Sequence, residues 1–267
     1  MLDHALTRLL PMLLIGLTCQ AVANPPSAVD EGYAIAALYD ISDAGFKDSR
    51  VKMEMILHNA AADSVSRHLT LSTLEKSSPN TGDKTLVVFS SPADVRDTAL
   101  LNHPKITSTD DQWLYLPSIK RVKRISTENK SGPFVGSEFA FEDFTSQELD
   151  KYSYRFLRRD HLQEREVNVV ERVPLDVNSG YSKQVVHFDI EHRQPLKIEF
   201  FDRKQAPLKT LVLSDYREYD GVWRSLDQRM TNHQTGKSTD LLLTDYEFDI
   251  GLSSNDFDST ALKRLTR

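Results

Sequence analysis

The sequence predicts a mainly β protein, in which a curved antiparallel sheet, or incomplete β-barrel, is covered by a few helices. Short segments with apolar residues at alternate positions recur along the chain, and Gly, Pro, Asn and Asp separate them at regular intervals. No strand–helix–strand alternation is visible, which argues against a doubly wound parallel sheet. A sheet of roughly twelve strands must curl or close to limit its exposed edges.

Residue spacing predicts the elements in order along the chain. Residues 28–41 are expected to form a helix, because apolar residues recur there at helical spacing and Gly45 follows. A strand is expected at 51–57, where the odd positions are apolar, and a short helix at 255–264 is expected to close the chain. The other strands are expected at 67–74, 84–89, 112–116, 122–126, 152–157, 166–173, 184–190, 196–201, 208–216, 222–230 and 240–248.

Composition excludes several classes of protein. The 267 residues include 33 Lys and Arg against 39 Asp and Glu, which gives a net charge of −6. This acidic balance argues against a nucleic-acid binder, which needs an excess of basic residues to displace counterions. The single cysteine excludes an internal disulfide, a zinc site built from cysteines and an iron–sulfur cluster.

Residues 1–23 resemble a secretory signal peptide. Arg8 supplies the positive charge, Leu9 to Leu17 form an apolar stretch about half as long as a membrane span, and Ala21-Val22-Ala23 fits a cleavage site. The alternative is a buried N-terminal helix. Cleavage after Ala23 would remove the cysteine and leave 244 of the 267 residues. We therefore expect a periplasmic protein in which residues 24–267 form a single domain.

Candidate catalytic and metal-binding residues are few. His187, Asp189 and Glu191 share one face of an expected strand and could bind a metal ion, but the apolar opposite face favours the polar face of an amphipathic strand. Glu142 and Asp143 are adjacent, so in a strand they would point to opposite faces, and turn or capping roles are favoured. No Gly-x-Ser-x-Gly nucleophile motif is present. We therefore expect no enzyme activity, catalytic residue, metal or cofactor, and a hydrolase is poorly supported.

A cationic run stands out in this acidic chain. Lys120, Arg121, Lys123 and Arg124 place four positive charges within five residues. Such a run could bind an acidic partner protein or anionic lipid headgroups. It could equally be a solvated strand edge that charge protects from aggregation. The sequence does not decide between these interpretations.

Large apolar side chains gather in the first half of the chain. Most aromatic residues of a β protein simply fill its core, and that is the commoner use. Methionine and aromatic side chains also adapt to irregular apolar ligands, so they can line a cavity of lipid size. The candidates for such a cavity are Met53, Met55, Leu57, Leu69, Leu71, Phe89, Trp113, Tyr115, Phe134, Phe139 and Phe141.

Three segments carry a resemblance to a known family. Residues 89–101 (FSSPADVRDTALL), 111–125 (DQWLYLPSIKRVKRI) and 132–144 (GPFVGSEFAFEDF) resemble the corresponding segments of the LolA-like outer-membrane lipoprotein-sorting proteins. Weaker agreement extends to the C-terminus. Asp97 replaces the family's usual glycine, which suggests a changed turn before Thr98.

The resemblance implies a curved, incomplete barrel with an apolar cavity for acyl chains, and a carrier role without catalysis. The partners that it implies are lipid or lipoprotein acyl chains and an inner-membrane permease of the RND/MMPL type, with no nucleic acid. An acyl chain needs such a shield to cross water, at about 0.8 kcal/mol for each buried CH₂. A protein–protein adaptor or sensor on the same fold is the second hypothesis, motivated by the cationic run.

Overall fold

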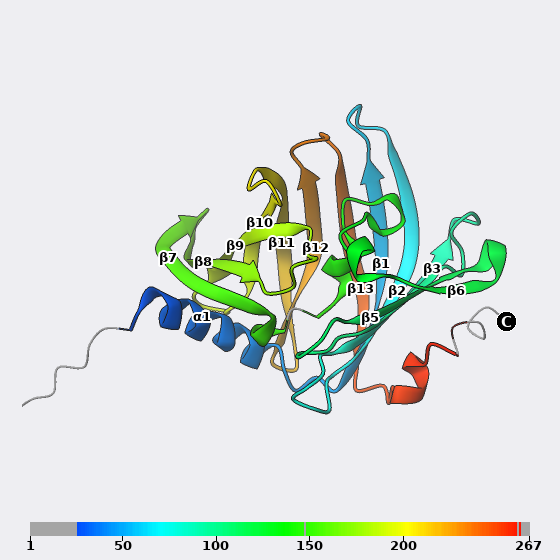
Figure 1. Cartoon of the computed structure of the whole chain (residues 1–267), viewed down its shortest axis with the longest axis horizontal. Coiled ribbons are helices and arrows are strands. Elements are labelled where there is room, and N and C mark those ends of the chain that lie inside the picture. The colour runs from blue at the N-terminus through cyan, green and yellow to red at the C-terminus, as the bar shows by residue number, and fades with distance from the viewer. Residues whose placement is uncertain (1–25, 147, 261, 263–267) are drawn as a thin grey trace, which may run out of the picture.

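Thirteen antiparallel strands of the computed structural model form one curved sheet (Figure 1). The structure describes residues 26–146, 148–260 and 262, so the signal peptide expected at 1–23 lies outside the described residues. Among the described residues, no helix is long and apolar enough to cross a membrane. The strands, in chain order, are β1 (Asp48–His58), β2 (Ser64–Leu74), β3 (Lys84–Ser91), β4 (Ala99–His103), β5 (Asp111–Leu116), β6 (Arg121–Arg124), β7 (Tyr152–Leu162), β8 (Arg165–Pro174), β9 (Tyr181–Asp189), β10 (Pro195–Asp202), β11 (Pro207–Tyr219), β12 (Val222–Asn232) and β13 (Ser238–Phe248).

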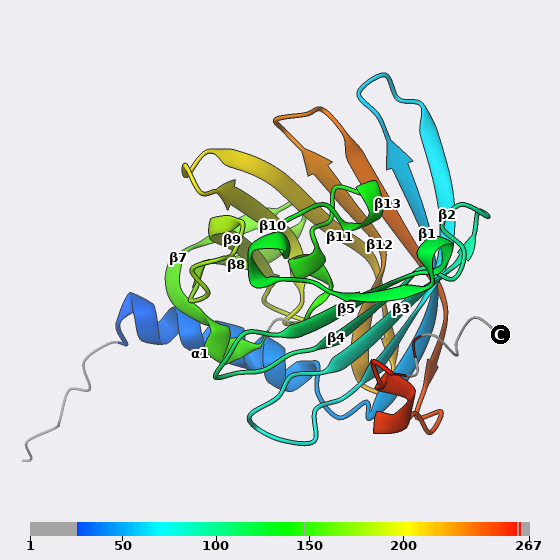
Figure 2. The same ribbon diagram turned by 45° about the vertical axis from the view of Figure 1, so that its right-hand side comes forward.

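The sheet consists of two meanders that meet at one seam. Its order is β6-β5-β4-β3-β2-β1-β13-β12-β11-β10-β9-β8-β7, so β1 pairs with β13 and the two edges are β6 and β7. Residues 125–151, here called the crossing segment, join one edge to the other. Figure 2 shows the sheet curling round this segment. The crossing segment contains the 3₁₀ turns η2 (Thr127–Asn129), η3 (Phe134–Gly136), η4 (Phe141–Phe144) and η5 (Leu149–Lys151), and η1 (Pro117–Ile119) precedes it.

The predicted fold class is confirmed, with two corrections to the elements. The strand β4 was not predicted, because four of its five residues are buried and its sequence shows no alternation. The helix expected at 255–264 is wrong at its start, where the structure has only the short 3₁₀ turn η6 (Ser254–Phe257). Leu262 is also in a 3₁₀ turn, and residues 261, 263 and 264 lie outside the described residues. The apolar residues Phe257 and Leu262 are nevertheless buried against the sheet.

The helix α1 (Ala28–Ser42) confirms the predicted N-terminal helix. It begins where the Ser27 hydroxyl accepts a hydrogen bond from the backbone N–H of Asp30. It packs against β7, with Gly32 directly over the backbone of Arg155 and Phe156. On the same side, the Tyr39 ring lies 5.7 Å from the Phe188 ring. The helix therefore covers both one edge of the sheet and part of its concave face.

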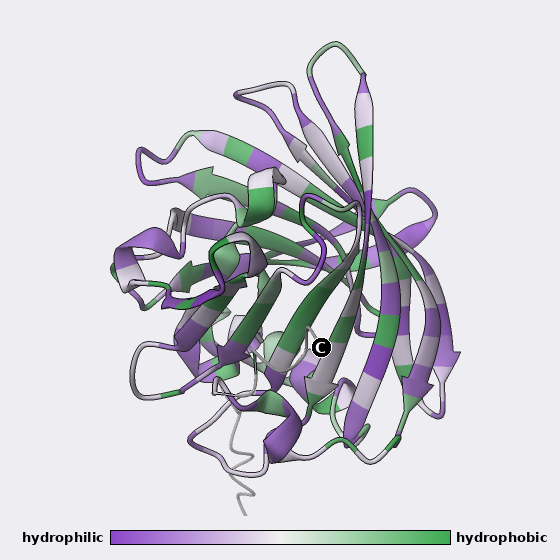
Figure 3. Cartoon of the chain, turned by 90° about the vertical axis from the view of Figure 1, so that its right-hand side faces the viewer, coloured by the Kyte–Doolittle hydropathy of each residue, from purple (hydrophilic) through white to green (hydrophobic). Residues whose placement is uncertain are grey.

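The two faces of the sheet carry separate apolar clusters. Figure 3 shows hydrophobic and hydrophilic residues alternating along many strands. The larger cluster lies on the concave face and includes side chains from α1 and the crossing segment. On the convex face, a smaller cluster joins Leu101 and Tyr115 to Phe257 and Leu262. The sheet is therefore covered on both sides near β4, which explains the continuous apolar sequence of that strand.

Candidate functional site

The concave face collects most of the predicted cavity residues. Nine of the eleven candidates belong to one apolar cluster on this face, either as buried members or packed against it. They come from β1, β2, β3 and the crossing segment: Met53, Met55, Leu57, Leu69, Leu71, Phe89, Phe134, Phe139 and Phe141. Residues from three neighbouring strands and from the crossing segment therefore meet on one surface.

Trp113 and Tyr115 lie elsewhere. Both belong to the convex cluster, with Phe257 and Leu262. Their strand neighbours Gln112 and Leu114 face the concave side, because successive side chains of a strand point to opposite faces. The resemblance segment 111–125 thus does not bring these two aromatic rings into the cavity.

The crossing segment fills the middle of the concave face with aromatic rings. Phe134 is fully buried, and its ring lies 5.6 Å from that of Phe89 on β3. The rings of Phe144 and Phe141 lie 4.4 Å and 5.6 Å from Phe134. The third resemblance segment (132–144) therefore occupies the interior of the curled sheet.

A buried ion pair anchors this segment to the opposite wall. The Lys209 ammonium on β11 lies 2.7 Å from Oδ2 of Asp143, and the two side chains are 5% and 9% exposed. Asp143 also accepts hydrogen bonds from the Tyr181 hydroxyl (2.8 Å) and the Ala140 N–H (2.7 Å). The Ala140 bond confirms a capping role for Asp143. The sequence analysis does not predict this salt bridge. The signal that could have indicated it is Lys209 itself, a charged residue on the strand face that it shares with Leu211.

Polar side chains hold the segment at further points. Glu142 accepts hydrogen bonds from the Ser179 hydroxyl (2.8 Å) and the Gly180 N–H (2.9 Å) of the β8–β9 loop. Its pKa is raised, mainly by burial. From the other wall, Arg67 donates to the Val135 carbonyl, and Gln112 donates to the Phe141 carbonyl at 2.9 Å. The crossing segment is thus bound to strands of both meanders.

An apolar cavity of about 330 Å³ remains beside the crossing segment. Three of the predicted cavity residues, Met53, Leu71 and Phe139, line it. Further lining residues are Val51, Phe144, Leu213, Leu241, Leu243 and Tyr246, and α1 contributes Tyr39. The apolar wall and the enclosing helix suit a ligand that must be kept from water.

Ionisable side chains also line this apolar cavity, among them Asp43, Lys76, Asp83, Glu148 and Arg224. Arg224 is paired with Asp43, and its guanidinium lies 5.1 Å from the centre of the Phe46 ring. Lys76 lies 2.9 Å from the Glu148 carboxylate. Burial raises the pKa of the neighbouring Asp83 to about 6. The lining therefore combines an apolar wall with charged side chains.

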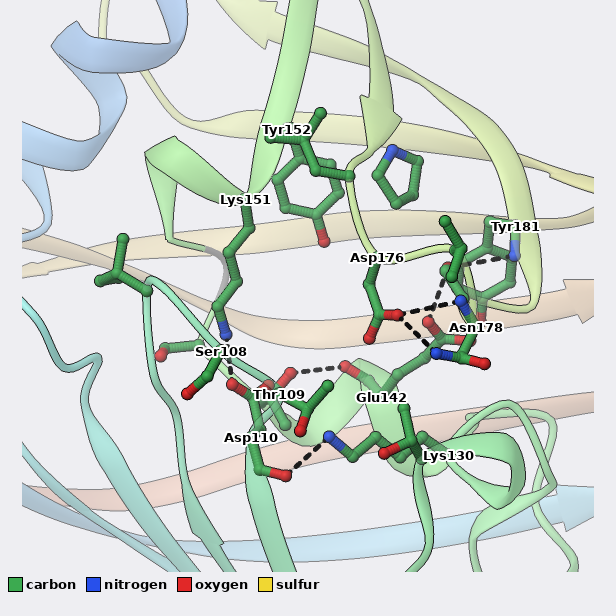
Figure 4. Close-up of a pocket in the computed structure, with 18 of the residues that line it drawn as sticks. Ser108, Thr109, Asp110, Lys130, Glu142, Lys151, Tyr152, Asp176, Asn178 and Tyr181 are labelled. Atoms are coloured by element: carbon green, nitrogen blue, oxygen red, sulfur yellow. Dashed lines mark hydrogen bonds and ion pairs between the residues drawn. The ribbon is translucent and has the colours of Figure 1, made fainter.

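A second, polar cavity of about 390 Å³ lies on the other side of the crossing segment (Figure 4). The β4–β5 loop lines it with Thr107, Ser108, Thr109 and Asp110, and the β8–β9 loop faces them with Asp176 and Asn178. The crossing segment supplies Lys130, Glu142 and Lys151. Asp143, Thr145 and Ser146 line both cavities, so this stretch forms a wall between them.

The predicted cationic run forms the edge strand β6. Lys120 precedes the strand in a left-handed conformation, and Arg121, Lys123 and Arg124 are exposed. Arg124 is ion-paired with Asp111 on β5. The unpaired cations of the run, among the residues that the structure describes, are therefore Lys120, Arg121 and Lys123.

His187 and Asp189 hold structural interactions. His187 is hydrogen-bonded to Glu199 at 3.0 Å, and the buried Asp189 carboxylate lies 2.9 Å from Arg165 and 2.7 Å from His192. Within the described ranges, no group of three or more His, Cys, Asp or Glu residues could hold a metal ion. Glu191 lies in the turn after β9 (Tyr181–Asp189), so the three residues do not share one strand face.

Comparisons with known proteins give several matches. A family model described as "Uncharacterized protein" matches residues 81–264. The crystal structure of a "putative outer membrane lipoprotein-sorting protein domain" from Vibrio parahaemolyticus is 50% identical in sequence, with a TM-score of 0.86, covering 88% of this chain and 100% of that one. The crystal structure of a DUF1329 family protein from Desulfovibrio piger is 26% identical in sequence, with a TM-score of 0.84, covering 89% of this chain and 100% of that one. A LolA superfamily protein from Nitrosomonas europaea shares the fold at 18% identity (TM-score 0.69; 85% and 97% covered). No curated protein matches the chain.

Proposed function

The chain belongs to the LolA-like family of outer-membrane lipoprotein-sorting proteins, and on this premise we propose that it is a periplasmic carrier of lipid or lipoprotein acyl chains. The observation that carries the proposal is the apolar cavity on the concave face, beside the crossing segment and under α1. Burying an acyl chain there would gain about 0.8 kcal/mol for each CH₂ removed from water. The proposal requires no catalytic residue.

The cavity is expected to bind acyl chains in the purified protein. Leu213 lines the cavity and is only partly buried, so Leu213→Trp should fill the space with little damage to the core. We expect this variant to weaken the binding of a fluorescent fatty acid by about tenfold or more, because the Trp side chain would leave several CH₂ groups of the ligand exposed to water.

Val212→Trp is the matched control, because Val212 is the exposed strand neighbour of Leu213. It should bind the fatty acid like the wild type. Equal loss in both variants, or no binding and no lipid extracted from the protein isolated from cells, would contradict the carrier proposal.

We further propose that the carrier works with an inner-membrane permease of the RND/MMPL type, which docks at β6. Support comes from the cationic edge of an acidic chain, which gives a surface complementary to an acidic partner. Should the cavity prove to hold no lipid, the same edge supports the second hypothesis of an adaptor or sensor.

Charge reversal at this edge tests the docking. The triple variant Lys120→Glu, Arg121→Glu and Lys123→Glu should abolish capture of the permease while leaving fatty-acid binding unchanged, because the edge lies apart from the apolar cavity. Arg158→Glu with Arg159→Glu on the opposite edge strand β7 is the control. Capture that persists in the triple variant would remove β6 as the docking surface.

A further inference from the structure

The polar cavity contains a buried ammonium group with a single neutral partner. Lys130 is 6% exposed, and its Nζ donates to the backbone carbonyl of Asp110 at 2.7 Å. Among the described residues, no carboxylate forms an ion pair with it. A buried ammonium that makes no ion pair is costly, and within the described ranges two of its three donors make no hydrogen bond. Burial lowers the pKa of Lys130, and the negative charges of Asp110 and Asp176 offset this only in part.

Four of the five carboxylates that line the polar cavity are engaged within the protein, and the fifth, Asp150, is exposed. Lys130 is therefore the buried charged group of the cavity with spare hydrogen-bonding capacity. The four engaged carboxylates and their partners are Asp110 with Lys151, Glu142 with Ser179 and Gly180, Asp143 with Lys209 and Tyr181, and Asp176 with Asn178.

Hydroxyl groups complete a set of donors for an anion. Thr107, Ser108 and Thr109 line the rim, and in the described part of the chain no hydrogen bond engages their side chains. The Ser146 hydroxyl, on the wall shared with the apolar cavity, is buried without a hydrogen-bond partner. One ammonium and several hydroxyls are the groups with which proteins bind phosphate oxygens when no arginine is present.

We propose that the polar cavity binds the phosphate of a glycerophospholipid headgroup, with the Lys130 ammonium as its ion-pair partner, while the acyl chains occupy the adjoining apolar cavity, which shares Asp143, Thr145 and Ser146 with it. The inference rests on the proposed carrier function and specifies its ligand. The volume of about 390 Å³ holds a headgroup larger than phosphate alone. Asn178, opposite the hydroxyl rim, offers its side-chain oxygen as an acceptor for a glycerol hydroxyl (Figure 4).

Paired ligands test this proposal by titration calorimetry on the delipidated mature protein. Dioctanoyl phosphatidylglycerol and dioctanoylglycerol carry the same acyl chains, but only the first carries a phosphate. The phospholipid should bind about tenfold tighter or more, as expected for a charge-assisted contact in a buried site. Equal affinity for the two lipids would overturn the phosphate site and leave the carrier proposal intact. Failure of both lipids to bind would overturn the carrier proposal itself.

Substitution of Lys130 tests the assigned residue. Lys130→Gln keeps a donor for the Asp110 carbonyl but removes the charge, so it should abolish the preference for phospholipid without changing the affinity for dioctanoylglycerol. Lys105→Met is the control, because Lys105 is a nearby cation outside the cavity. If the Lys130→Gln variant still binds the phospholipid more tightly than dioctanoylglycerol, Lys130 does not bind the phosphate and only holds the β4–β5 loop through the Asp110 carbonyl.

Free anions distinguish the source of the phosphate. Inorganic phosphate and glycerol 3-phosphate are titrated into the same protein. Both should bind at least about tenfold more weakly than the phospholipid, because they bury no acyl chain. Equal affinity for glycerol 3-phosphate would overturn the lipid assignment and identify a site for a free phosphate ester.

Discussion

Asp143→Asn is expected to lower the free energy of unfolding by about 3–5 kcal/mol, because it leaves the Lys209 ammonium buried without a counter-charge. The amide keeps an oxygen for the Ala140 N–H, so the change isolates the charge from the capping contact. In thermal unfolding, this loss corresponds to roughly 6–20 °C in Tm for a chain of this size. The crossing segment should also become more accessible to limited proteolysis.

The double variant Asp143→Asn with Lys209→Met provides the control for this prediction. Removing both charges leaves no unpaired ion, so most of the lost stability should return. A double variant as unstable as the sum of the two single variants would show that the ion pair itself contributes nothing to anchoring the segment.

Gly32→Ala is expected to destabilise the protein, although alanine is the better helix former. The new Cβ would lie 2.6 Å from the Phe156 nitrogen and 2.7 Å from the Arg155 carbonyl carbon, and neither backbone atom can move aside freely. The helix should gain about 1 kcal/mol of propensity, but overpacking typically costs 1–3 kcal/mol, and more where backbone blocks the way. We expect a net loss of about 2 kcal/mol in chemical denaturation.

Ala34→Gly isolates the propensity contribution, because Ala34 is exposed on the same helix. It should cost about 0.5–1 kcal/mol by backbone entropy alone. If Gly32→Ala instead stabilises the protein, α1 does not pack as closely against β7 as described. Since α1 also lines the apolar cavity through Tyr39, its displacement should weaken fatty-acid binding as well.

The strand pattern was predictable because most strands are covered differently on their two faces. Alternation marks β1, for example, whose odd positions face the concave cluster. It fails for β4, which is apolar on both faces, and it does not indicate which face of β5 is concave. Trp113 and Tyr115 lie in a predicted strand, with Tyr115 buried and Trp113 partly buried, but on the face opposite the concave cluster.

The site was less predictable because its contacts join distant parts of the chain. The sequence identified Phe134, Phe139 and Phe141 as apolar, but periodicity does not show that an irregular segment folds into the interior. Lys209 and Asp143 are 66 residues apart and belong to different kinds of element. Their pairing depends on how the sheet curls, which no local pattern encodes.

The seam between β1 and β13 has a consequence for the order of folding. Every other strand pair joins neighbours along the chain, whereas this one pairs Ser49 with Phe248. Local hairpins can form as soon as their two strands are available. The seam can form only when β13 is available, and its formation costs the entropy of closing a very long loop. The first strand therefore keeps one hydrogen-bonding edge open until the last strand has been made, and the newly synthesised protein is most exposed to wrong strand pairing during that interval.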